Sequence, residues 1–328
     1  MNKKSVTAFS VVAIIVAFLT LSCSVMDSVR RVFYSSELIT NDISSIVSKI
    51  RDKAEGGDFM AQNDLGLLYD QGRGVDRDYT QAVYWYKKSA EQGYESAQYN
   101  LGVAFEHGRG VQRNLQQALK WYSKSAGQGN TKSQVNLGMI YLDGIDGHKD
   151  YNKSRYWFLL AAKKNDTIAM NNLGYIYRSG LGTPKDNSEA FKWYQKSAYL
   201  GSMKARNMLA LYYTQEIGDY PVDVRKALGL LEASACQGYA VAQNNLGIIY
   251  SKGIGELPKN YKLAYAWFSV AFSNGHENAR RSLDDVAKKL TPQELEQARI
   301  LANEYIVKYS SSMIEDDTYK SNIECKYP

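Results

Sequence analysis

The chain has 328 residues, of which 45% are apolar and 23% charged, a balance typical of a folded protein. Its formal net charge of +6 is small for this length, and no run of five or more Lys or Arg residues occurs. The composition therefore argues against a nucleic-acid groove, and no nucleic-acid partner is predicted.

Residues 1–22 have the pattern of a signal peptide. Two early lysines precede an apolar run over residues 11–21, which is short for a bilayer span but suits the core of a leader. The run ends in TLSC at residues 20–23, which resembles a bacterial lipobox with Thr20 in place of the usual leucine. The resemblance implies that Cys23 is lipidated, becomes the mature N-terminus and begins a tether over residues 23–40.

Two other interpretations of this segment stay open: an ordinary signal peptide in which Cys23 has no role, and an uncleaved anchor. Lipidation would hold the protein stably, because each buried methylene contributes about 0.8 kcal/mol and two or more chains anchor where one does not. Ser24 follows the cysteine, whereas an aspartate there would resemble an inner-membrane retention signal. In a Gram-negative cell the outer membrane is therefore slightly favoured.

A unit of 36 or 37 residues recurs six times along the middle of the chain. A constant period of this length is the signature of stacked repeats, each too small to bury its apolar side alone. Two markers keep it: Leu65, Leu101, Leu137, Leu173, Leu209 and Leu246, and Trp85, Trp121, Trp157, Trp193 and Trp267, with Leu230 in the missing place.

The period predicts repeats at residues 58–93, 94–129, 130–165, 166–201, 202–238 and 239–275. An amphipathic segment at 41–57 is expected to form an N-terminal capping helix. Residues 276–309 are expected to form C-terminal capping helices, with Thr291 and Glu294 as a capping box for the last one. Residues 310–328 lack periodicity and are predicted to be a flexible tail.

Each repeat is predicted to contain two helices. Ala61, Leu65 and Tyr69 share one face of a first helix, and Trp85 and Ala90 share one face of a second. Expected N-caps of the second helices are Asp78, Asn114, Asp150, Asp186, Asp223 and Asn260. Expected left-handed residues at their C-terminal ends are Gly93, Gly129, Asn165, Gly201, Gly238 and Gly275.

The tryptophans are interpreted as core residues, each opposite the glycine of a Leu-Gly pair in the neighbouring helix. Burial of an indole is expected to outweigh the roughly 1 kcal/mol that a helical glycine costs. Trp157→Ala is accordingly expected to cost roughly 3–5 kcal/mol, and Asn171→Ala very little. The Gly-x-Gly pairs between helices, such as Gly72 and Gly74, follow helices rather than strands and are predicted to be turns rather than phosphate-binding loops.

The repeat pattern A-x-x-x-L-G-x-x-Y, G-x-G-V and D-x-x-x-A-x-x-W-Y-x-K-S-A-x-x-G resembles the Sel-one-like repeat, a relative of the tetratricopeptide repeat, over about residues 58–290. The resemblance implies an all-α, α/α solenoid (superhelix) used for protein–protein contact, and no reaction. Repeat five departs from the pattern, with Ala210 in place of the glycine and Leu230 in place of the tryptophan.

No catalytic, metal or cofactor site is predicted. His107, His148 and His276 lie far apart in sequence without a second ligand at metal spacing. Some members of the family carry a cysteine pair in each repeat and are associated with β-lactam binding, whereas this chain has none. A disulfide between Cys236 and Cys325 in an oxidising envelope is left open.

Two residue series before the repeat leucine are the candidates for polar contacts. The first is interpreted as a structural amide series with hydrogen bonds inside each repeat: Asp64, Asn100, Asn136, Asn172 and Asn245, with Met208 in repeat five. The second, one residue earlier, lies nearly opposite the apolar face on a helical wheel and is predicted to bind a partner in the concave groove: Asn63, Tyr99, Asn171, Asn207 and Asn244. A plain solvated face is the alternative for this second series.

These patterns predict a membrane-tethered interaction scaffold of the bacterial cell envelope that faces the periplasm and binds a protein or peptide of unknown identity. One alternative is an envelope hydrolase, or a binder of β-lactams or peptidoglycan fragments. Another is a cytoplasmic interaction module whose leader has been misread. The oligomeric state is left open.

Overall fold

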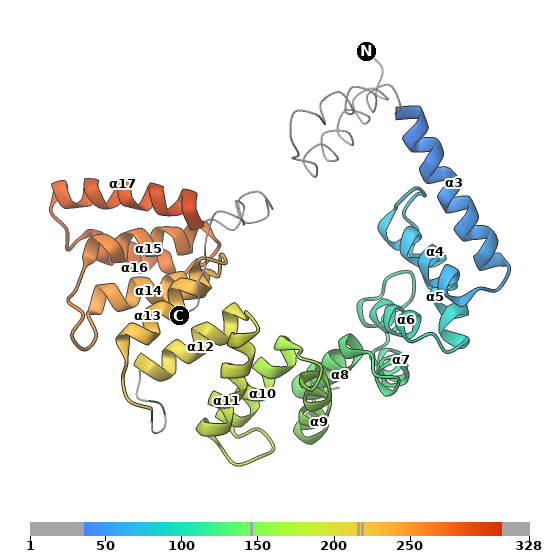
Figure 1. The fold of residues 1–328 in the computed structure, drawn as a ribbon, viewed down its shortest axis with the longest axis horizontal. Helices are drawn as coiled ribbons and strands as arrows, with labels where there is room; N and C mark the ends of the chain where they lie inside the picture. Colours follow the sequence, from blue (N-terminus) through green and yellow to red (C-terminus); the bar gives the residue numbers. More distant parts are fainter. Residues whose placement is uncertain (1–35, 145–146, 215–216, 218–219, 310–328) are drawn as a thin grey trace. The chain divides into compact units, whose positions relative to one another are not determined.

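The computed structural model describes residues 36–144, 147–214, 217 and 220–309, and this part of the chain forms an all-α helical repeat solenoid (Figure 1). No strand occurs among these residues, and none of their helices is long and apolar enough to cross a membrane. The predicted leader, Cys23, most of the predicted tether and the predicted tail lie outside the described residues.

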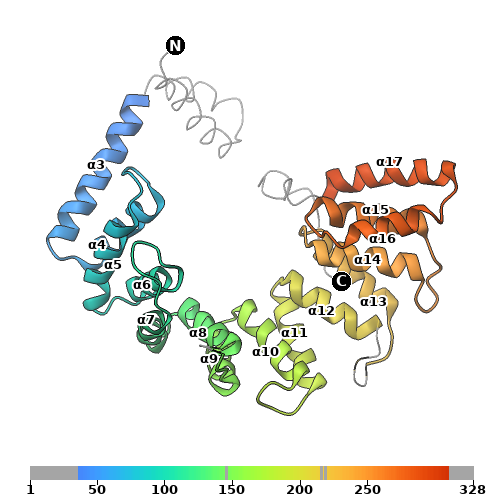
Figure 2. The ribbon, with the colours of Figure 1, turned by 180° about the vertical axis from the view of Figure 1, so that it is seen from behind.

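The chain divides into two compact units at Leu137 and Gly138, inside one helix, and each unit is described by itself. In both views, helices that follow one another within a unit lie side by side (Figures 1 and 2). The first unit contains α3 (Ser36–Glu55), α4 (Phe59–Gln71), α5 (Tyr79–Glu91), α6 (Glu95–His107), α7 (Leu115–Gly127) and the start of α8 (Thr131–Asp143).

The second unit contains the end of α8, then four second helices and three first helices of the repeats in alternation, followed by the terminal helices. They are α9 (Tyr151–Ala162), α10 (Thr167–Ser179), α11 (Asn187–Tyr199), α12 (Met203–Thr214), α13 (Val224–Ala235), α14 (Ala240–Lys252), α15 (Tyr261–Ser273), α16 (Ala279–Ala287) and α17 (Pro292–Tyr309). The even-numbered helices α4 to α14 are the first helices of the six repeats, and the odd-numbered helices α5 to α15 are the second helices.

The predicted helix starts and ends are confirmed. At Asp78 the side chain accepts hydrogen bonds from the amides of Thr80 and Gln81 at 2.9 and 3.0 Å. The other five predicted N-caps accept from a first-turn amide in the same way. Asn165 has a φ of 63° and is the one non-glycine residue of the described part with positive φ, as its place among the helix-ending glycines predicts.

The Gly-x-Gly segments are turns that also bring repeats together. Gly72 ends α4 in left-handed geometry, and its amide donates to the carbonyl oxygen of Leu68. A Cβ on Gly110 would collide with the backbone carbonyl of Tyr79 in the preceding repeat. Gly110 is the second glycine of the pair Gly108 and Gly110. A glycine is needed there for two reasons: its φ is 70°, and the backbone of the preceding repeat lies too close for a Cβ.

The aromatic ring that packs against the Leu-Gly glycine is not the tryptophan but the residue after it. A Cβ on Gly102 would lie 2.6 Å from two ring carbons of Tyr122, well inside van der Waals contact. The two helices therefore approach closely, as predicted. The prediction that Trp121 makes the contact with Gly102 is wrong, because Tyr122 makes it. The same contact joins Gly66 to Tyr86, Gly138 to Phe158, Gly174 to Tyr194 and Gly247 to Phe268.

The tryptophans differ in burial. Trp85, Trp121 and Trp267 are 4–8% exposed, and Leu230 in the place of the missing tryptophan is 3% exposed. Trp157 and Trp193 are only half-buried, whereas Phe158 beside Trp157 is fully buried. Trp157 is therefore less buried than predicted, because Phe158 occupies the interior of that repeat.

The C-terminal helix α17 covers the last repeat as a further first helix would. Tyr305 and Tyr309 of α17 each place their ring centroid 5.0 Å from that of Trp267. Gln243 and Asn274 donate side-chain hydrogen bonds to the carbonyl oxygen of Tyr309 at 3.1 and 2.9 Å. The capping box predicted before this helix is present, with Thr291 and Glu294 bonded reciprocally.

The glycine contact can be tested with a matched pair of alanines. Gly102→Ala is expected to destabilise the protein by roughly 1–3 kcal/mol, because overpacking against Tyr122 outweighs the gain in helix propensity. Gly127→Ala, in a helix with nothing within 4 Å of the new Cβ, is expected to leave stability unchanged or raise it by up to about 1 kcal/mol. Urea unfolding followed by circular dichroism measures both, and equal effects would contradict the packing assignment.

Candidate partner-binding site

Buried glutamines bind four of the six first helices to the helix that precedes each of them in the chain. In the first unit, Gln98 is 4% exposed, and its Nε2 donates to the carbonyl oxygen of Ala90 at 3.2 Å. Its Oε1 accepts from Nε2 of Gln128 at 2.8 Å. The carbonyl of Ala90 lies in the last turn of α5 and also accepts from the amide of Gly93 at 3.1 Å, so Gln98 adds a second hydrogen bond to it and ties α6 to the end of α5.

The same glutamine bond occurs in repeats one, two, three and six, whereas repeats four and five have Met170 and Arg206 at this position. The sequence analysis missed this series, although its regular position three residues before the repeat leucine was the available signal. Its other members are Gln62, bonded to Ala54, Gln134, bonded to Ala126, and Gln243, bonded to Ala235.

Buried serines of the second helices hold the two helices of a repeat together. Ser89 is fully buried, and its Oγ donates to the carbonyl oxygen of Phe59 at 2.6 Å. Ser125 and Ser234 do the same to Glu95 and Met203 at 2.7 and 2.8 Å. Each serine therefore satisfies a carbonyl of the first turn of its own repeat.

The structural amide series makes hydrogen bonds between repeats rather than inside them. Nδ2 of Asn100 donates to Oδ1 of Asn63 in the preceding repeat at 2.9 Å, and Asn245 donates to Asn207 at 2.8 Å. The prediction of bonds confined to one repeat is therefore wrong at these positions. The other members differ: Asn136 lies beside the Tyr122 hydroxyl, Asn172 bonds the Ile168 carbonyl of its own helix, and Asp64 is exposed.

The predicted groove series does not lie on a free outer face. Asn63 and Asn207 are each 4% exposed, so the helical-wheel placement of these two residues is wrong. Asn171 accepts from Ser197 at 2.8 Å and donates to Ser202 at 2.9 Å, which contradicts the expectation that Asn171→Ala leaves folding unchanged.

The other two members of that series are half-buried. The Tyr99 ring lies 6.0 Å from the Tyr122 ring, and Asn244 follows the buried Gln243. A binding role for the series stays a prediction. The physical reason for the difference is that a first helix contacts both its own second helix and the second helix of the preceding repeat, so it is covered on two sides.

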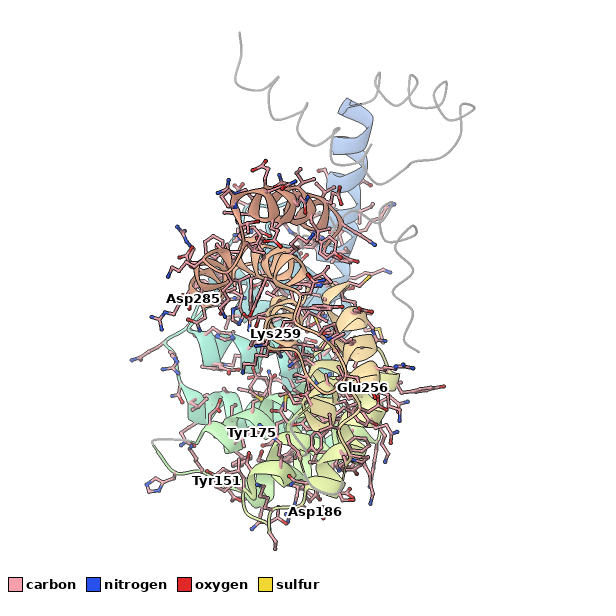
Figure 3. The ribbon with its side chains drawn as sticks, turned by 90° about the vertical axis from the view of Figure 1, so that its left-hand side faces the viewer. Tyr151, Tyr175, Asp186, Glu256, Lys259 and Asp285 are labelled. Carbon is pink, nitrogen blue, oxygen red and sulfur yellow. The ribbon has the colours of Figure 1, made fainter. Side chains whose placement is uncertain are left out.

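The side of the first helices that stays uncovered carries an apolar stripe. In the second unit, α10 exposes Ile168 by 56% and Tyr175, labelled in Figure 3, by 43%. Asn172 lies between them at helical spacing and therefore on the same side. We define the first-helix face of the second unit as these three residues and the equivalents of Asn172 and Tyr175 on α12 and α14: Ile168, Asn172, Tyr175, Met208, Leu211, Asn245 and Ile248. The equivalents of Ile168 are Lys204 and Val241.

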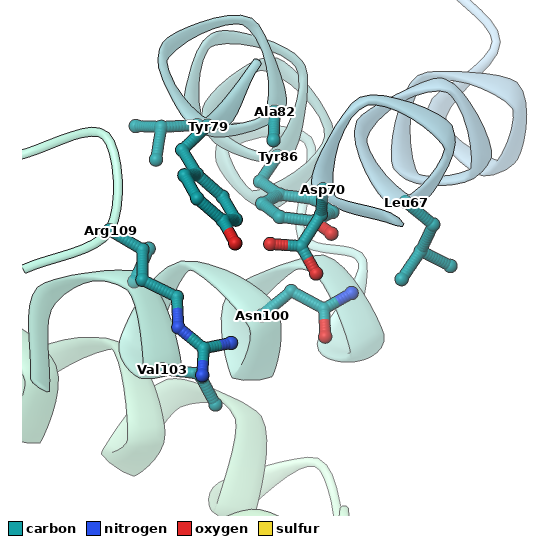
Figure 4. A pocket seen from close by; sticks show the side chains of 10 residues that line it. Leu67, Asp70, Tyr79, Ala82, Tyr86, Asn100, Val103 and Arg109 are labelled. Carbon is teal, nitrogen blue, oxygen red and sulfur yellow. The ribbon is translucent and has the colours of Figure 1, made fainter. Parts of the chain in front are cut away.

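The equivalent side of the first unit contains a small cavity between α4, α5 and α6, with a volume of about 50 Å³ (Figure 4). The Tyr79 hydroxyl and the Asp70 carboxylate point toward one another in it, and Tyr86, Asn100 and Arg109 complete its polar lining. Burial, and then the charge of Asp70, raise the pKa of Tyr86, so its phenol stays protonated. The space suits a few water molecules rather than a substrate.

No catalytic or metal-binding arrangement forms within the described ranges. The structure brings together no group of three His, Cys, Asp or Glu residues there that could hold a metal ion. Cys236 is 8% exposed and disulfide-bonded, and the other two cysteines of the chain, Cys23 and Cys325, lie outside the described residues.

Comparison with known proteins identifies the repeat. The Sel1 repeat model matches six segments, at residues 59–94, 95–130, 131–166, 167–202, 204–239 and 240–276. A solved structure of a protective antigen present in uropathogenic Escherichia coli strains, with an SLR fold, is 32% identical with a TM-score of 0.75, covering 87% of this chain and 60% of that one.

A second solved structure, a Sel1 repeat protein from Oxalobacter formigenes, is 31% identical with a TM-score of 0.60, covering 69% of this chain and 89% of that one. This chain thus spans less than two thirds of the length of the Escherichia coli protein. No curated protein sequence matches it.

The structural role of the glutamines gives a test. Gln98→Ala is expected to destabilise the protein by roughly 1–3 kcal/mol, because it removes two hydrogen bonds of a buried side chain that joins α6 to the helices on both sides of it. Gln116→Ala, at an exposed position of the following helix, is expected to change stability by less than about 0.5 kcal/mol. If the two variants unfold at the same urea concentration, Gln98 does not have the assigned role.

Proposed function

Because the chain belongs to the Sel1 repeat family, we propose that it is a protein-interaction scaffold tethered to a membrane of the bacterial cell envelope and facing the periplasm. Sel1 repeat proteins are generally protein-interaction scaffolds, and their fold is typically non-catalytic. The partner is a protein or peptide that docks on the first helices.

The observation that carries this proposal is the exposed apolar side of α10. Ile168 and Tyr175 are separated by two helical turns, so both project from the same side of the helix. Their exposure of 56% and 43% contrasts with the burial of Leu173 and Ile176 on the opposite side. Large apolar side chains grouped on a surface, with an amide between them, are typical of a protein-binding surface.

The envelope location is supported by three separate features. The N-terminal sequence has the pattern of a lipoprotein leader ending at Cys23, with the outer membrane slightly favoured by Ser24. The disulfide bond at Cys236 suits an oxidising compartment. The description of the Escherichia coli relative as a protective antigen favours an exposed envelope protein.

The tether is tested by metabolic labelling with a fatty-acid analogue. The wild-type chain is expected to take up label and to partition with membranes, whereas Cys23→Ala is expected to take up none, because the modified thiol is absent. Cys236→Ala is the control and is expected to label like the wild type. A Cys23→Ala protein that still labels would exclude lipidation at this residue.

The docking surface is tested by affinity capture from detergent-solubilised envelopes. The double variant Ile168→Ser and Tyr175→Ser is expected to lose at least about tenfold of the captured partner, since buried apolar anchors dominate interface energies. Tyr156→Ser and Tyr199→Ser, which change exposed aromatic residues of second helices in the same unit, form the matched control. Equal capture by both double variants would place the partner elsewhere.

A further inference from the structure

The first helices that lie wholly within one unit differ in charge, whereas α8, which spans the division, contains both Lys132 and Asp143. In the first unit, α4 and α6 contain Asp64, Asp70, Glu95 and Glu106 and no Lys or Arg. In the second unit, α10, α12 and α14 contain no Asp or Glu. Their charged residues are all basic: Arg178, Lys204, Arg206 and Lys252.

Three of these basic residues reach the surface beside the first-helix face of the second unit. Lys204 and Lys252 are exposed, and Arg178 is half-buried, one helical turn beyond Tyr175. Within the described part of the chain, no carboxylate lies within ion-pair distance of any of the three. Their positive charge is therefore available to a partner.

The second helices of the same unit behave differently. Lys153, Lys192 and Lys226 lie 3.1–3.3 Å from the carboxylates of Asp150, Glu189 and Asp223. These ion pairs partly neutralise the positive charge of the second helices. Other basic residues of the second helices, such as Lys196 and Arg225, also form no ion pair within the described residues, but the first helices differ in containing no Asp or Glu.

Arg178 lies beside phenols rather than beside a carboxylate, and it hydrogen-bonds the Tyr194 side chain. Its Nε is buried without a hydrogen-bond partner, and so is the hydroxyl oxygen of Tyr212, which is fully buried. The guanidinium lies near both Tyr212 and Tyr194. Burial raises the pKa of each phenol, and the positive charge of Arg178 partly offsets that rise. The Asp186 carboxylate, which also acts on Tyr212, already caps α11 through the amide of Glu189 at 2.8 Å.

We propose that the first-helix face of the second unit binds an acidic protein segment whose carboxylates meet Arg178, Lys204 and Lys252 while its apolar side chains cover Ile168 and Tyr175. A carboxylate gives these cations a charged acceptor, which no ion pair within the described residues supplies. The proposal rests on the scaffold function above and adds the chemical class of the partner. The acidic first helices of the first unit would repel the same segment, which restricts it to the second unit.

The test uses the full chain in mild detergent and three labelled peptides of equal length. The peptides share the same leucine and tyrosine anchors, and their other positions alternate glycine with Glu, Gln or Lys. Fluorescence anisotropy measures binding at low and moderate salt. The Glu peptide is expected to bind about tenfold more tightly than the Gln peptide at low salt, with a smaller preference at moderate salt because exposed charges are screened.

The variants separate a local effect from one of net charge. The triple variant Arg178→Gln, Lys204→Gln and Lys252→Gln is expected to lose the preference for Glu. The control triple variant Lys153→Gln, Lys192→Gln and Lys226→Gln removes the same net charge from second helices and is expected to bind within about twofold of the wild type. If Arg178→Gln lowers helix content, the double variant of the two exposed lysines replaces the triple variant and is expected to lose part of the preference.

Three outcomes would overturn the acidic partner: equal binding of the Glu and Lys peptides, equal loss in both triple variants, or tighter binding of an oligothymidylate than of the Glu peptide. A further result separates this proposal from the scaffold function. If Ile168→Ser with Tyr175→Ser weakens all three peptides equally and no preference for Glu exists, the docking surface stands and only its charge class is wrong.

Discussion

The contact between the glycine of each Leu-Gly pair and an aromatic ring of the following helix sets the spacing of the repeat. With a Cβ in place of the glycine hydrogen, the ring carbons would lie at 2.5–2.6 Å in five of the six repeats. The two helices must therefore approach closely enough for the ring to lie directly on the backbone. Repeat five has Ala210 at this position, and there the second helix supplies Leu231, a smaller side chain than Tyr or Phe.

Buried polar side chains then fix how one repeat meets the next. An apolar interface alone tolerates sliding, whereas a buried hydrogen bond is lost if its partners separate. Serines join the two helices of a repeat, glutamines join a first helix to the preceding second helix, and asparagines such as Asn100 join consecutive first helices. Together these hydrogen bonds fix the position of each helix along its neighbours, which packing of leucine and alanine side chains alone would not fix.

These internal hydrogen bonds determine which residues of the first helices remain free to bind a partner. Most polar residues near the repeat leucine are already engaged inside the protein, so they have little capacity left for a partner. The positions that stay uncovered are Ile168, Tyr175 and their equivalents, and they differ from repeat to repeat in size and charge. Variation at these positions, such as Lys204 in place of Ile168, changes the surface without altering the core.

The sequence by itself determined the period, the two helices of each repeat and their ends. These features depend on contacts within a few residues, such as the cap at Asp78 or the left-handed Asn165, and local contacts leave a local pattern. Only the tertiary structure decided that Tyr122 rather than Trp121 meets Gly102, and that Asn63 is buried rather than outward. A helical wheel assumes one covered side, whereas each first helix here lies between two second helices, and which side stays free depends on how both neighbours pack.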